Sequence, residues 1–466
     1  MPETKKMKLT FAGGTGWVTG ANFLLETVEE DSGKKSFKML IDCGLIQGEA
    51  VAEDENWQPF PYDPKEIDLL FITHAHEDHI GRIPKLVYEG FNGKIIGTAA
   101  TRDLTSVMLK DTANILGGSR VAGKLHLNKI YAEEVLKKID QMWETHEYHQ
   151  NFRPREDISV TFKDAGHILG SAMVEIYYNN SKIVFTGDLG NSPSPLLADT
   201  EVLHDAKYLV MESVYGDRNH EDRSEREENL KKAILETYNK KSVLMVPIFS
   251  LERTQEFLYQ INNFVESKQI PSMKIYLDSP LAIRLTDVFR KHTNLFKETV
   301  RSQIKAGDNI FEFQGLKETE KTEDSKAILH SPNPKIIMAG SGMSQGGRIL
   351  HHEKNYLSDP NATLLLTGYQ TPGTLGRLIE EGRREIIIMH ERIKVRAKVF
   401  KISGYSGHKD SFHLVKFVED SKDTLQKIFL VMGEPRSSMF LAQKIHDNLG
   451  LKTFVPELYE SVVLEF

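Results

Sequence analysis

Short runs of apolar, mostly β-branched residues recur along the chain, and polar turns end several of them. Runs of this length and composition are typical of buried strands. Four of the runs lead directly, or through a short glycine-containing turn, to a carboxylate or an imidazole. The residues at these ends are Asp42, Asp188, Glu212 and His408. Because strands of layered α/β folds present their carboxyl ends at a shared edge, the pattern predicts that these side chains gather at one site.

The pattern changes between Glu212 and about residue 390, where apolar strands alternate with amphipathic helices. The expected strands are 242–246, 336–338 and 363–366, and the expected helix is 251–264. This alternation predicts a separate parallel α/β unit. Residues 217–232 are dense in both charges and predict a solvated loop and helix face at the junction. A chain of 466 residues is too long for one ordinary core, which agrees with a second unit.

The amino-acid composition indicates a globular protein without a membrane span or an internal disulfide. Hydrophobic residues make up 40% and charged residues 27%, as in soluble globular proteins, and no apolar run approaches the roughly 20 residues of a membrane span. The single cysteine, Cys43, excludes an internal disulfide, fits a buried filler and agrees with a cytoplasmic location. A net charge of -7 disfavours a surface that is basic overall, so a nucleic-acid partner would need a local positive cleft.

A dense group of potential metal ligands follows the apolar run 68–73. These ligands are His74, His76, Asp78 and His79, with His167 and Asp188 further along the chain. Neutral imidazoles and carboxylates suit zinc, and the set is large enough for two ions. A surface histidine cluster is the alternative, but this spacing directly after a buried strand favours the metal site.

Together these residues resemble the motifs of the metallo-β-lactamase superfamily and, within it, of the β-CASP nucleases. Asp42, 74–79, His167 and Asp188 resemble the four superfamily motifs in order, Glu212 in 211–216 resembles motif A, and His408 in 406–410 resembles motif B. The stretches 278–282, 340–347 and 368–376 are also similar to the family. The resemblance covers nearly the whole length of the chain.

The resemblance implies an α/β fold, a metallo-β-lactamase αββα sandwich with an inserted β-CASP parallel α/β domain. The first part of the sandwich would span residues 1–212, and the β-CASP domain would span 213–392. Residues 393–466 would complete the sandwich.

It also implies a ligand set and a reaction. One zinc would take His74, His76 and His167, the other Asp78 and His79, with Asp188 bridging and Asp42 orienting the ligands. The expected activity is hydrolysis of RNA phosphodiester bonds by metal-activated hydroxide. Glu212 and His408 would form the acid pair for the leaving oxygen, and together with Asp78 and Asp188 they are the expected catalytic residues. The expected partner is single-stranded RNA, and the resemblance admits a homodimer.

Several positions are weaker candidates for RNA contacts. Backbone N–H groups around Ser341 and Gly342, with Arg348 nearby, suit a phosphate, although a tight turn explains the same glycines. Arg253 and Arg377 are further candidates, with solvated helix charges as the alternative. The segment 393–399 alternates basic and apolar residues as a strand would, which fits either a basic channel or an edge strand protected by charge.

One position departs from the family pattern. RNA-acting members usually carry a histidine after the strand that corresponds to 429–431, and this chain has Met432. A thioether is a poor zinc ligand, so the second site would be one ligand short. The second site would then be completed by water, or be weak, or belong to a protein that binds nucleic acid without cutting it. DNA-acting members carry an apolar residue here, so a DNA nuclease is a further alternative.

Overall fold

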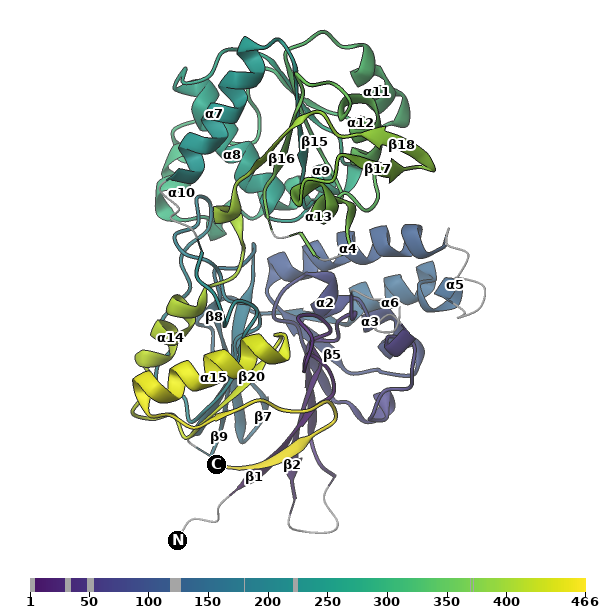
Figure 1. The fold of residues 1–466 in the computed structure, drawn as a ribbon. Coiled ribbons are helices and arrows are strands. Elements are labelled where there is room, and N and C mark those ends of the chain that lie inside the picture. The colour runs from purple at the N-terminus through teal and green to yellow at the C-terminus, as the bar shows by residue number, and fades with distance from the viewer. Residues whose placement is uncertain are drawn as a thin grey trace. The chain divides into compact units, whose positions relative to one another are not determined.

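The computed structural model describes residues 5–29, 35–47, 54–117, 127–179, 181–220, 225–368, 370–371 and 373–466 (Figure 1). Contacts divide the chain into two compact units. Unit 1 comprises Met1–Ser194, Ala198–Asn219 and His408–Phe466, and unit 2 comprises Pro195–Leu197 and His220–Gly407. None of the helices formed by the described residues combines the length and the apolarity that a bilayer span requires.

Unit 1 contains two seven-stranded sheets. The first has the order β22-β1-β2-β3-β4-β5-β6 and the second the order β21-β20-β11-β10-β9-β8-β7. The strands of the first sheet are β22 (Ser461–Glu465), β1 (Lys6–Phe11), β2 (Phe23–Val28), β3 (Lys38–Ile41), β4 (Leu69–Phe71), β5 (Lys94–Gly97) and β6 (Trp143–Thr145). Those of the second are β21 (Thr453–Phe454), β20 (Lys427–Val431), β11 (Tyr208–Glu212), β10 (Ser181–Phe185), β9 (Ala172–Tyr178), β8 (Ile158–Asp164) and β7 (Phe152–Arg155).

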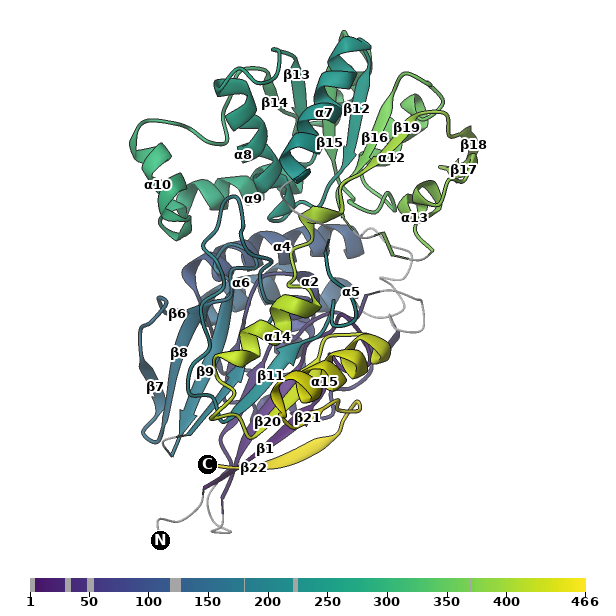
Figure 2. The same cartoon turned by 60° about the vertical axis from the view of Figure 1, so that its left-hand side comes forward.

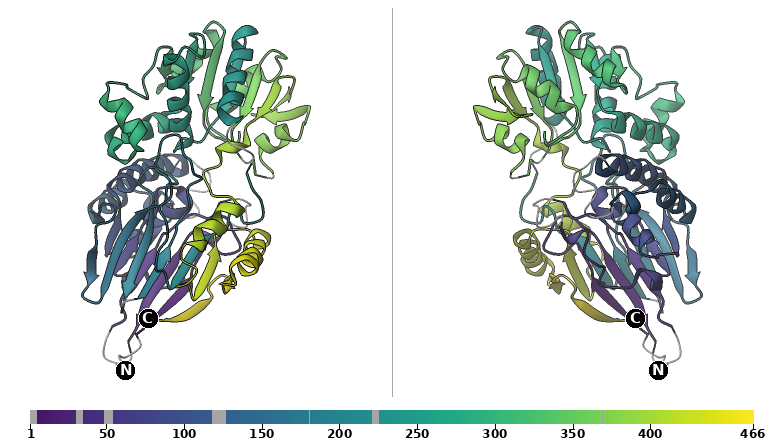
Figure 3. Two further views of the ribbon diagram at one scale, coloured as in Figure 1. Left: turned by 90° about the vertical axis from the view of Figure 1, so that its left-hand side faces the viewer. Right: turned by 90° about the vertical axis from the view of Figure 1, so that its right-hand side faces the viewer.

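Helices cover the outer faces of these two sheets, as both views of Figure 3 show. The first sheet is flanked by α2 (Glu77–Ile80), α3 (Ile83–Tyr88), α4 (Ala99–Gly117), α5 (Leu127–Ile130) and α6 (Glu133–Met142). The second sheet is flanked by α14 (Ser411–Glu419) and α15 (Pro435–Leu449). Unit 1 is therefore an αββα sandwich, which confirms the predicted fold class.

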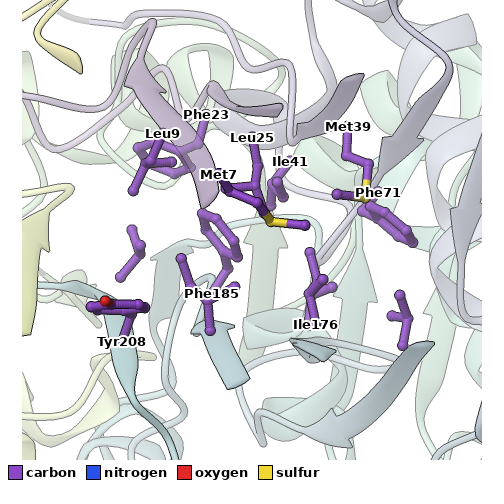
Figure 4. Close-up of a cluster of buried hydrophobic side chains, with 14 of the residues drawn as sticks. Met7, Leu9, Phe23, Leu25, Met39, Ile41, Phe71, Ile176, Phe185 and Tyr208 are labelled. Carbon is purple, nitrogen blue, oxygen red and sulfur yellow. The ribbon is translucent and has the colours of Figure 1, made fainter. Parts of the chain in front are cut away.

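The core of the sandwich lies between the two sheets. In β1 every second residue is buried, so Met7, Leu9 and Phe11 face the second sheet. Figure 4 shows Met7 and Leu9 of the first sheet on one side of the core, and Ile176 and Phe185 of the second sheet on the other. A period of two places alternate side chains on one face of a strand, so one apolar face on each sheet is enough to build this core.

Unit 2 contains a six-stranded sheet of the order β14-β13-β15-β12-β16-β19, in which all paired strands are parallel (Figure 2). The strands are β14 (Leu316–Glu318), β13 (Lys274–Leu277), β15 (Lys335–Ala339), β12 (Val243–Pro247), β16 (Thr363–Leu366) and β19 (Lys398–Lys401). The helices of at least six residues are α7 (Arg226–Asn239), α8 (Arg253–Glu266), α9 (Pro280–Lys291), α10 (Glu298–Lys305), α11 (Thr322–Ala327), α12 (Ile349–Tyr356) and α13 (Leu375–Glu380). The strands and the helix expected in this region are all present, and α8 is the helix expected at 251–264.

The prediction of one strand over 393–399 is wrong. β17 (Glu385–Ile388) and β18 (Glu391–Lys394) form a separate antiparallel hairpin that ends at Lys394. The next residues turn, and the backbone N–H groups of Arg396 and Ala397 both donate to the Leu357 carbonyl. β19 then pairs with β16 at the edge of the six-stranded sheet, and by contacts unit 2 runs to Gly407.

The loop after β3 lies directly against the backbone of α2. The N–H of Cys43 donates to the His79 carbonyl at 2.8 Å, and the N–H of Gly44 donates to the Ala21 carbonyl at 2.9 Å. A Cβ atom at Gly44 would lie 1.5 Å from the carbonyl oxygen of Asp78. Only glycine therefore permits this approach, which fixes α2 against the end of β3.

We expect Gly44→Ala to lower the free energy of unfolding by about 1–3 kcal/mol, because the added methyl group overlaps a backbone atom that cannot rotate away. Urea unfolding followed by circular dichroism measures the change. Gly346→Ala is the matched control, since a Cβ there meets no atom within 4 Å. Equal unfolding midpoints for the two variants would contradict the close approach at Gly44.

Candidate metal centre

The predicted ligands come together in unit 1 at the ends of strands from both sheets. The first sheet supplies Asp42 after β3 and the segment His74–His79 after β4. The second sheet supplies Asp188 after β10 and Glu212 at the end of β11. His408 reaches the same place just before α14, and its backbone forms a bridge with Gly190. The strand-end pattern of the sequence thus corresponds to one cluster of side chains.

The first group of ligand atoms has the spacing of a tetrahedral site. His76 Nδ1 lies 3.1 Å from His74 Nε2 and 3.2 Å from His167 Nε2. Asp188 Oδ2 lies 3.4 Å from His74 Nε2 and 3.5 Å from His167 Nε2. Ligands about 2.0–2.1 Å from a tetrahedral zinc are about 3.3–3.4 Å apart, so the four atoms fit such an ion.

The second group consists of Asp78, His79 and the other oxygen of Asp188. His79 Nε2 lies 3.4 Å from Asp188 Oδ1 and 3.8 Å from Asp78 Oδ2. Both His79 Nε2 and Asp188 Oδ1 are buried and have no hydrogen-bond partner in the part of the chain that the structure describes. Buried unsatisfied polar atoms cost about 1–3 kcal/mol each, and a cation between them satisfies both. The two oxygens of Asp188 thus each face one group.

Burial keeps the histidines of the first group in their ligating form. Loss of hydration lowers the pKa of His74, and it holds the pKa values of His76 and His167 well below the usual range. Burial acts to raise the pKa of Asp188, but the neighbouring His79 and His74 outweigh it and hold that pKa well below its usual range. The group therefore combines neutral imidazoles with a carboxylate anion, which is the form that binds a divalent metal.

Asp42 and Thr73 fix the orientation of two ligands. Asp42 Oδ2 accepts from His79 Nδ1 at 2.7 Å, so His79 Nε2 is the ring nitrogen that is left to face a metal. Thr73 Oγ1 donates to the same oxygen at 2.8 Å and lies 3.1 Å from His74 Nδ1. Because the single hydroxyl proton is used on Asp42, Thr73 accepts from His74 Nδ1–H, and His74 Nε2 is likewise free for a metal.

Thr73 is a further functional residue, which the sequence motifs do not predict. Its signal in the sequence is its place between the end of β4 and His74, where a hydroxyl is adjacent to the first ligand. The backbone N–H of Thr73 also donates to Asp42 Oδ1 at 2.8 Å, so three groups fix the Asp42 carboxylate.

His408 lies beside this cluster with a buried carboxylate behind it. His408 Nδ1 is 3.1 Å from Glu212 Oε2 and 3.9 Å from Asp188 Oδ2. Glu212 is fully buried, and its Oε1 accepts from the N–H of Leu189 at 2.5 Å. Burial acts to lower the pKa of His408, but the charges of Glu212 and Asp188 outweigh it and raise that pKa to about 9. This imidazole is therefore equipped to hold a proton next to the candidate metal ligands.

Met432 is buried in the apolar core between the two sheets. It follows β20 with a φ of 50°, and its N–H donates to the Gly14 carbonyl at 2.7 Å. Its side chain is part of the hydrophobic cluster between the sheets, and a Cβ on Gly14 would lie 2.8 Å from its sulfur. The thioether thus packs against the glycine-containing loop after β1.

Cys43 is also buried, and burial raises the pKa of its thiol to about 12. Both observations agree with the prediction that this residue fills space in the core.

The weaker candidates for RNA contacts all lie in unit 2, where the structure pairs them with protein groups. Arg348 donates to Asp278 at 2.8 Å and to the carbonyls of Thr319 and Glu320, Arg253 pairs with Glu256, and Arg377 pairs with Glu381. Ser341 Oγ accepts from the N–H groups of Gln345 and Gly346, so this loop uses those donors internally. Within the family-like stretch 368–376, Tyr369 and Pro372 lie outside the described residues.

Three families of known proteins match consecutive parts of the chain. The metallo-beta-lactamase superfamily matches residues 33–234, the Beta-Casp domain matches 254–379, and the Zn-dependent metallo-hydrolase RNA specificity domain matches 392–456. A solved structure of a protein of unknown function from Enterococcus faecalis has a TM-score of 0.56 at 13% identity, over 98% of this chain and 100% of that one. This last likeness concerns the fold alone.

Curated relatives are similar over most of the chain. A ribonuclease from Thermus thermophilus is 34% identical over 437 residues, which cover 94% of this chain and 95% of the relative. An RNase J-like protein from Methanocaldococcus jannaschii is 33% identical over 90% of this chain and 92% of the relative. The transcription termination factor FttA from Pyrococcus horikoshii is 31% identical over 99% of this chain and 72% of the relative.

Proposed function

Since the chain belongs to the β-CASP family of the metallo-β-lactamase superfamily, we propose that it hydrolyses phosphodiester bonds in RNA at a zinc centre built on Asp188. The observation that carries the proposal is the Asp188 carboxylate between two groups of ligands, with the Glu212–His408 pair beside it. RNA as the substrate is supported by the RNA specificity domain matched over 392–456 and by relatives named as ribonucleases.

Each group of ligands would hold one zinc ion. His74, His76 and His167 with Asp188 Oδ2 would hold the first, and Asp78 and His79 with Asp188 Oδ1 the second. When bound, zinc supplies hydroxide at neutral pH and neutralises charge that develops on the phosphate. The second group has three protein ligands, and catalytic zinc sites commonly pair three protein ligands with one open position. The missing imidazole at Met432 is therefore compatible with a catalytic second site.

The chain's own residues then orient the ligands and supply a proton. Asp42 and Thr73 accept from Nδ1 of His79 and His74, which would direct Nε2 of each ring at a bound metal. His408 holds its Nδ1 proton on Glu212, so its Nε2 proton is available to the leaving oxygen of the cleaved strand. Glu212, fixed by the Leu189 N–H, stabilises the imidazolium before the transfer.

Single-stranded RNA is the proposed form of the substrate, because its unpaired bases are open to contact by side chains. The homodimer and the cytoplasmic location stay predictions.

We expect Asp188→Ala to abolish cleavage of single-stranded RNA, because the variant removes a ligand from both groups at once. Cleavage of a labelled oligonucleotide and zinc content by mass spectrometry are measured on the same preparations. Asp199→Ala, at an exposed aspartate of the same unit, is the control and keeps both. Cleavage that survives Asp188→Ala would refute the proposed centre, and a wild-type protein with one zinc or none and no cleavage would indicate a binding subunit.

Thr73→Val is expected to weaken zinc binding by roughly 10–100-fold, because the isosteric side chain removes the acceptor of His74 Nδ1–H. Competition with a chromogenic chelator on metal-stripped protein gives the affinity without any assay of activity. Thr73→Ser keeps the hydroxyl and should retain the affinity. Thr105→Val is the matched control, since that buried hydroxyl has no hydrogen-bond partner among the described residues. Equal losses of zinc affinity in Thr73→Val and Thr105→Val would show that Thr73 has no specific role in zinc binding.

Matched RNA and DNA strands of one sequence separate the proposed substrate from the alternative that Met432 raises. We expect the wild-type protein to cut the RNA strand faster by at least about tenfold, a difference of about 1.4 kcal/mol in the barrier. The rates are measured under single-turnover conditions at equal strand concentrations. Equal rates, or a preference for DNA, would contradict RNA as the substrate.

A further inference from the structure

Phe249 is an exposed aromatic residue at the carboxyl edge of the unit 2 sheet, by which we mean the side where β13, β15, β12 and β16 end. It lies two residues after β12, and its side chain is 41% exposed, whereas the preceding Ile248 is fully buried. β12 is flanked by β15 and β16. Ligands of open parallel sheets bind outside the carboxyl ends of the strands, so this ring lies where such a sheet offers a site.

Two glycines make room for the ring. A Cβ atom on Gly342, which follows β15, would lie 2.6 Å from Cδ2 and 2.8 Å from Cε2 of Phe249. A Cβ on Gly368, which follows β16, would lie 4.0 Å from Cε2. Any side chain at residue 342 would overlap the ring. The backbone of two neighbouring strand ends therefore seats Phe249 while part of its surface stays open.

The backbone that carries the ring is held in place by α8. Thr254 Oγ1 donates to the Phe249 carbonyl at 2.7 Å, and Gln255 Nε2 donates to the Ser250 carbonyl at 3.1 Å. The N–H of Ile248 donates to the Ala339 carbonyl of β15 at 3.0 Å. The ring is thus presented by a fixed turn, and a fixed aromatic surface loses little entropy when it binds.

Hydroxyl groups lie along the same edge. Ser250 Oγ and Ser279 Oγ are 3.3 Å apart, and a Cβ on Gly340 would lie 3.6 Å from the first and 3.8 Å from the second. Serine hydroxyls both donate and accept, so they can pair with the edge of any base. The N–H groups of Gln345 and Gly346 on the neighbouring loop already donate to Ser341, which favours a base over a phosphate at this edge.

We propose that Phe249 is a stacking platform for one nucleobase of the single-stranded RNA, seated by Gly342 and Gly368, with Ser250 and Ser279 beside it. The ligand class is an unpaired nucleobase of any identity, since every base has a π-face. This inference rests on the proposed function, because it assumes that RNA is the substrate. It adds a binding position in unit 2 that is separate from the metal ligands of unit 1.

The test measures RNA binding in a protein that cannot cut. Asp188→Ala provides the background, and the probe is a fluorescent 12-nucleotide single-stranded RNA followed by anisotropy. Phe249→Ala is expected to weaken binding by about 5- to 150-fold, the equivalent of about 1–3 kcal/mol. Phe249→Tyr should restore most of the affinity, and Phe249→Leu, which keeps an apolar side chain without a π-face, should not.

A set of 12-mers, each lacking one base, locates the stacked nucleotide. At the right position the base-free RNA should bind the Phe249 protein as weakly as the complete RNA binds Phe249→Ala, and the two losses should not add. Tyr238→Ala is the control, because Tyr238 is 38% exposed near the end of α7, on the side of the sheet where β12 begins. Thermal unfolding of each variant checks that the fold is kept.

The outcomes separate this inference from the proposed function. Equal affinities for Phe249→Ala, Tyr238→Ala and the background protein would overturn the platform, even if the wild-type protein cuts RNA. The platform would also be overturned if Phe249→Ala lowered the affinity for every base-free RNA by the same factor as for the complete strand. No single base would then interact with Phe249. Absence of RNA cleavage by the wild-type protein would instead refute the proposed function.

Discussion

The metal centre depends on one buried charge, the carboxylate of Asp188. A buried ion costs several kcal/mol unless other charges and hydrogen bonds compensate it. Here His74, His79 and His408 lie within 3.9 Å of its two oxygens and keep it ionised despite its burial. Oδ1 nevertheless has no hydrogen-bond partner among the described residues. A buried carboxylate that stays ionised but has one oxygen without a hydrogen bond is suited to bind a divalent cation. The other polar residues of the centre either stabilise the charge of Asp188 or lie where they can bind the same cation.

The apolar packing between the two sheets brings that charge to its partners. Asp42 and the histidines of residues 74–79 follow strands of the first sheet, whereas Asp188 follows a strand of the second sheet and Glu212 ends another. Neither sheet holds a complete set of ligands. The core that contains Met7 and Phe185 sets the distance between the sheets, and with it the 3.4 Å that separates an Asp188 oxygen from His74 Nε2 and the other from His79 Nε2. Stability of the sandwich and geometry of the centre therefore have the same physical origin, because densely packed cores hold their neighbours in place.

The parts that could be predicted from the sequence are those with a local signature. An apolar run that ends in a polar residue marks a strand end, so the gathering of Asp42, Asp188, Glu212 and His408 followed from the pattern of single strands. The role of Thr73 could not be predicted in this way. Its hydroxyl lies near Asp42, His74 and His79, and the sequence does not show which of these side chains accepts its one proton. The prediction of a single strand over 393–399 was wrong for a related reason. Alternation shows which face a side chain takes, but it does not show where a hairpin ends and the chain turns into another sheet.

Met432 shows how packing and ligation compete for one position. The residue lies at the end of β20, beside β11 and its terminal Glu212, where an imidazole could serve the centre. Instead its thioether joins the core and contacts the loop of Gly14, to whose carbonyl its own N–H donates. An imidazole in that apolar contact would bury polar atoms among carbon, which costs free energy unless a metal accepts them. The chain thus gains a packed contact between β20 and the loop after β1, and the group of Asp78, His79 and Asp188 keeps an open position. In the proposed mechanism such a position takes water and substrate, so Met432 is compatible with activity.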